Sequence, residues 1–296
     1  MAKKTNPDLI ICGDIHAGLL TPECRKDVYI ETLCRKLGFI KGLQEKYECP
    51  VIMPGDLFNH WRADSVLLNA IHPVWPSDVL AVAGQHDLPQ HSIELIEKTA
   101  LQTLVNYGQV QMIVSGTTIA PGLTLYGMPW EAPVPKPQPR GIKVLVAHVT
   151  IWEKPFMPGQ KPGEASRFLK QHKDFDLIIT GDNHCQFVIE DKGRLLVNAG
   201  SLMRLRSDQI DHIPRVYLWW RDGELKAVDI PIESDAVTRE IRDAKLEREE
   251  RVSAFVKKLE GSAEIGITFE ENVKVLMENQ KVDKNVRSII LECMGR

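Results

Sequence analysis

The sequence predicts an α/β fold of four layers, in which two packed sheets lie between layers of helices, followed by a helical C-terminal extension. Two observations predict this architecture. In the first half of the chain, short apolar runs alternate with helical stretches, and this βαβα rhythm is typical of a largely parallel sheet. In the second half, many short strands are separated by turn signals such as Asp191-Lys192-Gly193, and a second sheet would accommodate them.

Buried strands and helices are expected to alternate in the first half. The apolar runs that predict strands are residues 9–12, 51–53 and 79–83, and helices are expected near residues 25–47, 64–72 and 91–107. Asp64 can cap the second helix, because an aspartate side chain accepts a hydrogen bond from a backbone N–H of the first turn. The third helix is predicted by apolar residues at a 3.6-residue period, namely Ile93, Ile96, Leu101, Leu104 and Val105.

Shorter strands follow in the second half. They are expected at residues 110–114, 123–126, 144–146, 177–180, 187–190, 195–197, 216–220 and 225–230. Two proline-rich segments, residues 129–139 and 155–162, flank His148. Their length is typical of loops that wall a binding site, and plain surface loops are the alternative.

The composition changes from about residue 235 onward, where the chain becomes helical and highly charged. We therefore place the first domain at residues 1–232 and the helical extension at residues 233–296. An apolar stripe along the first helix of the extension predicts that one of its faces is covered. Two further helices are predicted by capping residues, which are Thr268 with Glu271 for one and Asp283 for the other.

The bulk properties argue against some classes of protein. A formal net charge of −3 is unlike that of a globally basic nucleic-acid binder, although a local basic patch could still hold the phosphates of DNA. The 6 cysteines form neither a CxxC pair nor a disulfide-scaffold spacing. The N-terminal residues lack a signal-peptide core, and the chain has no apolar run of membrane length. We therefore expect a reduced, cytoplasmic protein that does not associate with a membrane.

Polar clusters follow several of the expected strands. They supply four aspartates and four histidines, and they are Gly13-Asp14-Ile15-His16, Gly55-Asp56, Gly84-Gln85-His86-Asp87, Ala147-His148 and Gly181-Asp182-Asn183-His184. In an α/β fold, ligands bind just outside the carboxyl ends of the parallel strands, so these side chains are expected at a single rim. Carboxylates together with imidazoles suit Mn, Fe or Zn, and two such metals ~3.5–4 Å apart are typical of phosphate ester hydrolysis.

The order of these clusters resembles the signature of the calcineurin-like metallophosphoesterases, which is Asp-x-His, Gly-Asp, Gly-Asn-His-Asp/Glu, His and Gly-His-x-His. The resemblance covers residues 9–201 and implies the four-layer sandwich of that superfamily. Within it, the chain looks most like the DNA double-strand-break repair nucleases of the SbcD type. The motifs that carry this closer likeness are Gly55-Asp56-Leu57-Phe58, the following Arg62 and Ser65, and Asn198-Ala199-Gly200-Ser201-Leu202-Met203-Arg204.

The resemblance also implies a role for each cluster residue. The metal ligands that it implies are Asp14, His16 and His184 for the first metal, Asp56 as the bridge and His148 for the second metal. His86 matches the histidine that lies near the leaving group, and Asp87 would orient its imidazole. A carboxylate bonded to one ring nitrogen raises the basicity of the other, which suits a proton donor to a departing alkoxide.

Two residues depart from the family pattern, and both fall in the second metal site. Gln85 stands where the family has asparagine, and Asp182 stands where it has the first histidine of Gly-His-x-His. If both still coordinate, the site is harder and more negative, which favours Mn²⁺ or Mg²⁺ over Zn²⁺. If they do not, that metal binds weakly or arrives with the substrate. We expect two divalent ions, Mn²⁺ first, with Mg²⁺, Fe²⁺ and Zn²⁺ as alternatives.

Residues around the clusters are candidates for substrate binding. SbcD-like nucleases place a histidine three residues after the bridging aspartate, and here that position is Asn59, followed by His60. His60 could take over the role after a small loop shift, or it could be a solvated loop residue. Arg62 lies in the same loop. Arg204 and Arg206 could contact a nucleic-acid backbone, and a solvated basic face is the alternative.

Together these features favour a metal-dependent phosphodiesterase that acts on DNA and resembles an SbcD-type exonuclease subunit. Two alternatives stay open: a small-substrate phosphatase or cyclic-nucleotide phosphodiesterase, and a scaffold of the same fold with a catalytically impaired site. The resemblance implies DNA and an SMC-like ATPase of the SbcC type as partners. Residues 233–296 could dock on that ATPase or pack on the first domain, and a homodimer is also open.

Overall fold

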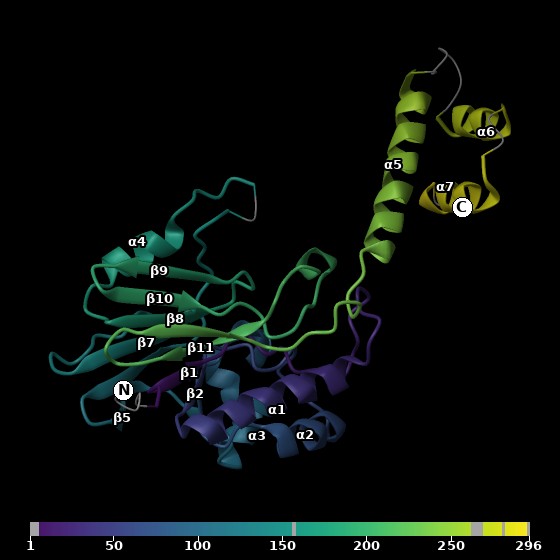
Figure 1. The fold of residues 1–296 in the computed structure, drawn as a ribbon. Helices are drawn as coiled ribbons and strands as arrows, with labels where there is room; N and C mark the ends of the chain where they lie inside the picture. Colours follow the sequence, from purple (N-terminus) through teal and green to yellow (C-terminus); the bar gives the residue numbers. More distant parts are fainter. Residues whose placement is uncertain (1–5, 156–157, 262–268, 280–281, 295–296) are drawn as a thin grey trace. The chain divides into compact units, whose positions relative to one another are not determined.

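The computed structural model describes residues 6–155, 158–261, 269–279 and 282–294. The chain divides into two compact units, Met1–Thr238 and Arg239–Arg296, which Figure 1 draws as ribbons. Among the helices of this described part, none is both long and apolar enough to cross a membrane.

The first sheet of the first unit has the strand order β12-β11-β1-β2-β3-β4. Its parallel strands are β1 (Leu9–Ile11), β2 (Val51–Met53), β3 (Val79–Ala81) and β4 (Gln111–Met112). Two further strands extend the sheet on the β1 side. β11 (Arg215–Trp219) pairs antiparallel with β1, and β12 (Leu225–Asp229) pairs antiparallel with β11. Because the four parallel strands point the same way, their carboxyl ends lie along one edge of the sheet.

The second sheet has the strand order β5-β6-β7-β8-β10-β9. Its strands are β5 (Ser115–Ala120), β6 (Leu123–Met128), β7 (Ile142–His148), β8 (Leu177–Gly181), β9 (Phe187–Asp191) and β10 (Arg194–Asn198). Strands β6, β7, β8 and β10 pair in parallel, whereas β5 and β9 are antiparallel strands at the two edges. This sheet is therefore also mixed, with a parallel centre.

Alternating side chains along the strands build apolar layers on both faces of each sheet. Ile10 of β1 packs in the cluster formed with α1 (Tyr29–Tyr47), α2 (Ser65–Ile71) and α3 (Ala100–Asn106), whereas its neighbour Ile11 packs against the second sheet. On the outer face of the second sheet, Ala165 and Leu169 of α4 (Glu164–Gln171) join a third cluster. The layer order is thus α/β/β/α, and the predicted fold class is confirmed (Figure 1).

The helix expected near residues 91–107 is divided in the structure. Residues Ile93–Lys98 form a 3-10 helix, and α3 begins only at Ala100. Thr99 lies between them in an extended conformation, and its hydroxyl accepts a hydrogen bond from the backbone N–H of Gln102 at 3.0 Å. The threonine therefore caps a new helix, which the apolar period alone did not reveal.

The second unit, in its described part, contains α5 (Glu240–Gly261), α6 (Phe269–Asn279) and α7 (Lys284–Cys293). Val273 and Met277 of α6 are buried in a small cluster with Phe255 of α5 and Ile290 of α7. Asp283 caps α7 as expected, because its carboxylate accepts a hydrogen bond from Asn285 N at 2.8 Å. The expected capping residue Thr268 lies outside the described residues.

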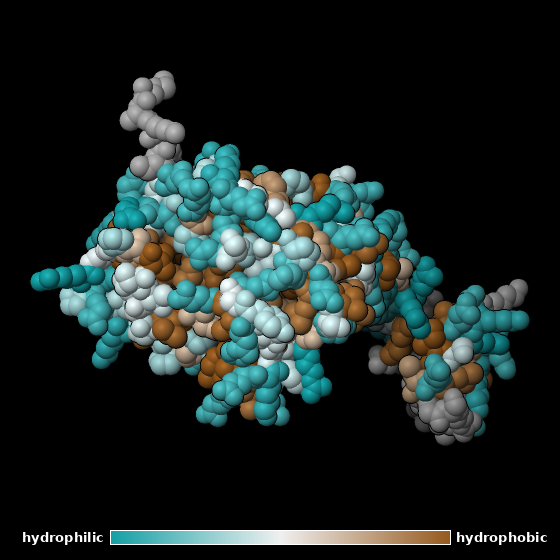
Figure 2. Space-filling view, turned by 90° about the horizontal axis from the view of Figure 1, so that it is seen from below, coloured by the Kyte–Doolittle hydropathy of each residue, from teal (hydrophilic) through white to brown (hydrophobic). Residues whose placement is uncertain are grey.

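Apolar side chains also lie on the outside of this unit. Ile241 and Leu246 of α5 and Val275 of α6 are exposed. Figure 2 shows apolar patches on the visible face of the helical unit, between hydrophilic side chains. Helix α5 therefore keeps apolar side chains exposed that the two shorter helices do not cover.

Candidate metal centre

The polar clusters lie just beyond the carboxyl ends of strands from both sheets. They are Asp14 with His16 after β1, Asp56 after β2, Gln85 with His86 after β3, His148 at the end of β7, and Asp182 with His184 after β8. These side chains therefore come close together at one rim of the sandwich.

Asp14, His16 and His184 form a first group of potential ligands. One ligand atom from each lies within 4.8 Å of the others. The Nε2 atoms of His16 and His184 are 2.9 Å apart, and His184 Nε2 lies 3.7 Å from Asp14 Oδ2. Two imidazole nitrogens and a carboxylate oxygen make a donor set that divalent transition metals bind.

Asp56, His148 and Asp182 form a second group with the same mutual spacing. His148 Nε2 lies 3.5 Å from Asp56 Oδ2 and 3.9 Å from Asp182 Oδ1. Asp56 Oδ2 also lies 3.8 Å from His16 Nε2, which belongs to the first group. The Asp56 carboxylate therefore lies between the two groups, where a bridging ligand of a dinuclear centre would be.

The two residues that depart from the family pattern contact each other. The amide nitrogen of Gln85 donates to Asp182, and Gln85 Oε1 lies 2.6 Å from His148 Nε2. The hydroxyl of Thr150 donates to the other carboxylate oxygen of Asp182. Sequence reasoning missed Thr150, and the one signal that could have found it is its position two residues beyond His148.

Buried oxygen atoms without partners fit a pair of cations. Within the described part of the chain, Asp14 Oδ1 and Asp56 Oδ2 are buried and take part in no hydrogen bond. Buried polar atoms are nearly always satisfied, and an unpaired one costs ~1–3 kcal/mol. Divalent cations at the two groups would satisfy both oxygens, so the residues present fit a dinuclear divalent metal site.

Glycine makes room for these ligands at two turns. A Cβ on Gly84 would lie 2.2 Å from Asp56 Oδ1, and one on Gly55 would lie 2.2 Å from His148 Nδ1. Gly55 also has a φ of +112°, a backbone conformation that side chains with a Cβ rarely adopt. The Gly-Asp and Gly-Gln turns therefore allow a close approach between neighbouring strand ends.

Burial and mutual attraction set the charges of the ligands in the absence of metal. Burial lowers the pKa of His16 to about 3, so its imidazole is neutral, the form that binds metals. Burial opposes the ionisation of Asp56, but the nearby positive charge of His148 outweighs this effect and lowers the pKa of Asp56 to about 2. Burial likewise opposes the charge on His148, but attraction to Asp56 and Asp14 outweighs the effect of burial and raises the pKa of His148 to about 9. Coordination by His148 must therefore displace a proton.

His86 lies at the exposed edge of the centre, with its ring centroid 5.1 Å from that of His16. Its Nδ1 faces the carbonyl oxygen of Asn59 at 3.2 Å. The Asp87 carboxylate is directed elsewhere and accepts hydrogen bonds from the backbone N–H groups of Leu57, Phe58 and Gly84. The expectation that Asp87 orients the imidazole directly is thus corrected: a backbone carbonyl faces the ring, and Asp87 fixes the two loops that carry Asn59 and His86.

His60 and Arg62 lie on the same exposed loop as Asn59. The His60 ring stacks on Trp61 at a centroid distance of 5.3 Å, and its Nδ1 accepts a hydrogen bond from Arg62 N at 3.1 Å. The Arg62 guanidinium lies 4.2 Å from the centroid of Trp61. The described groups of potential metal ligands do not include His60, which packs on the tryptophan instead.

Arg204 and Arg206 differ sharply in exposure. Arg204 is only 2% exposed and donates to the carbonyl oxygens of Ile210 at 3.0 Å and Glu233 at 2.6 Å. A buried guanidinium with these partners cannot reach a nucleic-acid phosphate, so the expected substrate contact of Arg204 is corrected to a structural role. The Arg206 side chain is 73% exposed beside Asp208 and stays a candidate for substrate binding.

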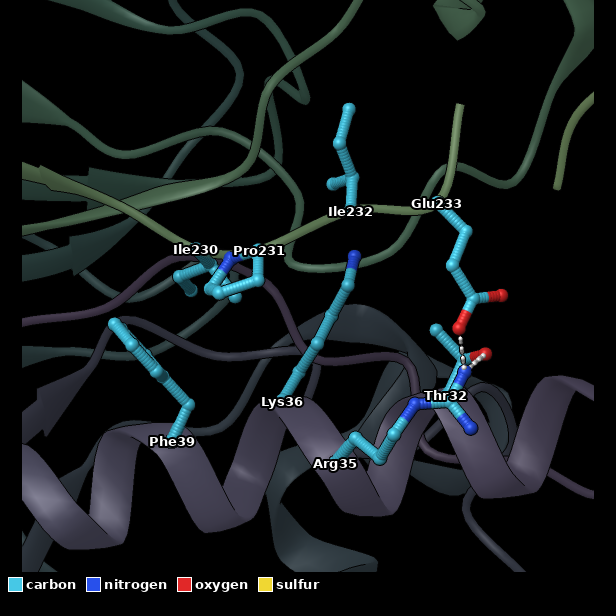
Figure 3. A pocket seen from close by; sticks show the side chains of 8 residues that line it. All are labelled: Thr32, Arg35, Lys36, Phe39, Ile230, Pro231, Ile232 and Glu233. Carbon is cyan, nitrogen blue, oxygen red and sulfur yellow. Dashed lines mark hydrogen bonds and ion pairs between the residues drawn. The ribbon is translucent and has the colours of Figure 1, made fainter. Parts of the chain in front are cut away.

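The buried Lys36 is connected to the metal centre through the backbone of Leu202. Lys36 of α1 donates to the carbonyl oxygen of Leu202 at 2.7 Å, and Leu202 N donates to the carbonyl oxygen of Asp14 at 2.8 Å. Burial, followed by the charge of Arg25, lowers the pKa of Lys36 to about 7. Lys36 also lines a pocket between α1 and residues 230–233, and Figure 3 shows it extending from the helix toward Ile232.

Aspartates and histidines that converge at the strand ends of an α/β/β/α sandwich are typical of a metal-dependent phosphoesterase. Residues 7–186 match the family model described as calcineurin-like phosphoesterase. This match spans more than half of the sequence, and the chain belongs to that family.

The chain also matches solved structures, among them three at 11–13% sequence identity. TT1561 of Thermus thermophilus is 13% identical with a TM-score of 0.44, and the match covers 77% of this chain and 100% of that one. A structure described as a novel archaeal phosphodiesterase is 11% identical with a TM-score of 0.39, covering 75% and 99%. Vps29 of Chaetomium thermophilum is 12% identical with a TM-score of 0.34, covering 76% and 96%. A search of curated proteins found no match.

Proposed function

We propose that the protein is a metal-dependent phosphodiesterase that hydrolyses DNA, similar to an SbcD-type exonuclease subunit, with its catalytic residues in a domain at 1–232. The observation that carries the proposal is the convergence of carboxylates and imidazoles in two adjacent groups, with the Asp56 carboxylate of the second group 3.8 Å from His16 of the first. The choice of DNA is supported by the likeness of Gly55-Asp56-Leu57-Phe58 and of residues 198–204 to the motifs of those nucleases.

Two divalent cations would be held by the residues of the two groups. The ligands we assign are Asp14, His16 and His184 for the first, Gln85, His148 and Asp182 for the second, and Asp56 for both. When bound, such cations lower the pKa of water toward ~7 and stabilise charge on phosphate oxygens. Because Gln85 and Asp182 supply oxygen atoms, Mn²⁺ is the ion we favour, and Mg²⁺ is the next.

His86 is the residue we assign to the leaving group. Its exposed ring lies beside the first group, and the Asn59 carbonyl facing Nδ1 favours a hydrogen on that nitrogen. Nε2 of the imidazolium is then free to donate a proton to the departing oxygen. A positioned acid of this kind typically contributes ~10²–10⁴-fold to the rate.

The test of the proposal is cleavage of end-labelled single-stranded and double-stranded DNA in Mn²⁺, Mg²⁺ or EDTA. We expect the labelled strands to shorten in Mn²⁺, more slowly in Mg²⁺, and to stay intact in EDTA. Intact DNA in both metals would reject the nuclease assignment. Bis-p-nitrophenyl phosphate and nucleotides, tested in parallel, would then reveal the alternative of a small-substrate phosphatase or cyclic-nucleotide phosphodiesterase.

The alternative of a catalytically impaired scaffold is kept open by Gln85 and Asp182. Metal analysis of the purified protein separates it from the enzyme, because a scaffold should retain little metal after dialysis. The six retained family residues weigh against it, since a scaffold needs none of them. They are Asp14, His16, Asp56, His86, His148 and His184.

We also propose that the helical extension, residues 233–296, docks on a partner, for which an SMC-like ATPase of the SbcC type is the first choice. The exposed apolar residues Ile241, Leu246 and Val275 support a docking role, since solvated helices seldom present several such side chains on one short unit. Replacing Ile241 and Leu246 by serine should abolish co-purification with the ATPase while leaving DNA cleavage by the isolated chain unchanged. Equilibrium sedimentation of the isolated chain would detect a homodimer instead.

A further inference from the structure

A small groove adjoins the metal centre in the first unit. It measures about 290 Å³ and is lined chiefly by Leu20, Thr21, Pro22, Tyr29, Asn59 and Leu205. These residues come from the loop after His16, the start of α1, the loop after β2 and the segment that follows β10. Its size is at the lower end of the ~300–1,000 Å³ that is typical of ligand pockets.

Two hydrogen bonds connect the groove to the catalytic residues. The Tyr29 hydroxyl donates to the carbonyl oxygen of His16 at 2.8 Å. Asn59 lines the groove, and its backbone carbonyl oxygen faces His86 Nδ1 at 3.2 Å. Asn59 therefore belongs both to the groove and to the contact with His86, the residue assigned to the leaving group.

The lining is neutral and largely apolar. Among the described residues that line the groove, none carries a charge. Leu20 is 88% exposed at its rim, and Leu205 is half-buried on the other side. A single exposed leucine is ordinary on a protein surface, but one that edges a cavity beside a catalytic centre can contact a ligand. Such a lining does not suit a phosphate, and it does suit a planar neutral group.

The buried Arg25 forms hydrogen bonds with the backbone of both walls of the groove. Arg25 N donates to the carbonyl oxygen of Pro22 at 2.9 Å, and Arg25 Nη1 donates to the carbonyl oxygen of Arg204 at 3.0 Å. Pro22 is in one wall, and Arg204 directly precedes Leu205 in the other. The guanidinium also pairs with Asp27. A groove with fixed walls loses little freedom when a ligand binds, which favours affinity.

We propose that this groove binds the nucleobase of the leaving fragment when a nucleic-acid phosphodiester occupies the metal centre. The base would lie between Leu20 and Leu205, and the Asn59 amide and the Thr21 hydroxyl can form hydrogen bonds with its edge. The inference rests on the proposed phosphodiesterase function, because it places the leaving group beside His86. Beyond that function, the inference identifies the nucleobase of the leaving fragment as a second part of the substrate that the protein recognises, besides the scissile phosphate.

The experiment compares two substrates in Mg²⁺: a thymidine dinucleotide and the matched dinucleotide whose leaving sugar lacks its base. Packing a base against two leucine side chains removes apolar surface from water, and we expect this burial to be worth about tenfold in affinity. The wild-type protein should therefore show a KM about tenfold lower for the complete dinucleotide. Leu20→Ser should raise that KM about fivefold and leave the KM of the abasic substrate unchanged. Val114→Ser, a matched control at a residue that is 65% exposed, should change neither.

The proposal is overturned if wild-type protein shows equal KM values for both substrates, or if Leu20→Ser raises both equally. A second measurement separates this outcome from failure of the proposed function. Saturation-transfer NMR of thymidine with the Mg²⁺-loaded protein should give a signal that Leu20→Ser loses and Val114→Ser retains. If wild-type protein cleaves neither dinucleotide, the phosphodiesterase proposal fails, and this signal alone decides whether the groove binds a base.

Discussion

The Nε2 atoms of His16 and His184 lie 2.9 Å apart although 168 residues separate them in the chain. Burial lowers the pKa of both imidazoles, so both are neutral near pH 7. Two neutral rings with these nitrogens facing each other can share one hydrogen, or both can bind the same cation through their lone pairs. The nearby Asp14 carboxylate favours the cation.

Removing one of these ligands should remove one metal. We expect His184→Ala to lower the bound metal from about two equivalents per chain to about one, because the Asp56, His148 and Asp182 group stays intact. Plasma mass spectrometry after dialysis against Mn²⁺ measures the content. His72→Ala serves as the control, since His72 is an exposed histidine that no described ligand group includes. Two equivalents in His184→Ala would remove this histidine from the centre.

Replacing the proposed leaving-group acid should affect turnover rather than metal binding. We expect His86→Gln to lower kcat for DNA cleavage ~10²–10⁴-fold, the usual contribution of a general acid. Metal content should stay at the wild-type value. His86 also lies within ligand distance of His16 and Asp56, so a parallel loss of metal would reassign it as a ligand.

The Thr150 hydroxyl should matter for the second cation. It donates to the Asp182 carboxylate, and loss of such a supporting hydrogen bond typically weakens metal affinity ~10–100-fold. We therefore expect Thr150→Val to weaken binding of one of two Mn²⁺ ions in calorimetric titrations. Thr150→Ser keeps the hydroxyl and should retain the wild-type affinity. Equal affinities for the valine and serine variants would show that the hydroxyl has no such role.

Lys36 should make stability depend on pH in a predictable direction. Its pKa falls from an ordinary value of 10.5 to about 7 through burial and the charges of Arg25 and Arg204, with Asp27 opposing. Between these values the unfolded chain binds the extra proton, so the free energy of unfolding should rise with pH and level off below pH 7. The slope for one proton is at most ~1.4 kcal/mol per pH unit.

Urea unfolding of wild type and Lys36→Met between pH 6 and pH 9.5 isolates this contribution. The stability difference should move in favour of wild type as the pH rises above 7. A constant difference across this range would mean that the buried ammonium group titrates normally. The methionine keeps the apolar stem of the side chain and so limits the effect of lost packing.

Much of the centre was predictable from local patterns. A Gly-Asp or Gly-x-His cluster after an apolar run fixes the place of its side chains, because parallel strands end at the same edge. Asp56 and His148 illustrate this, since Asp56 lies three residues after the end of β2 and His148 is the last residue of β7. The split helix at Thr99 was missed because its apolar period continues across the break.

Contacts between distant segments could not be predicted in this way. The burial of Arg204 depends on carbonyl oxygens at Ile210 and Glu233, and no local pattern announces such partners. Asp87 likewise finds its partners at residues 57 and 58, about thirty positions earlier. An aspartate can orient a catalytic histidine and an arginine can bind a phosphate, so both residue types fitted the expected roles. Only the tertiary structure revealed that their partners are backbone groups.

The ligand-bearing strands β1, β2 and β3 belong to one sheet, whereas β7 and β8 belong to the other. Neither sheet alone carries a full set of donors for either cation. Ion capture is therefore coupled to closure of the sandwich, and it favours the assembled state over any in which the sheets have parted. Chelators should thus make the first unit more susceptible to heat and to proteases, and cells short of these ions would accumulate less of the native protein.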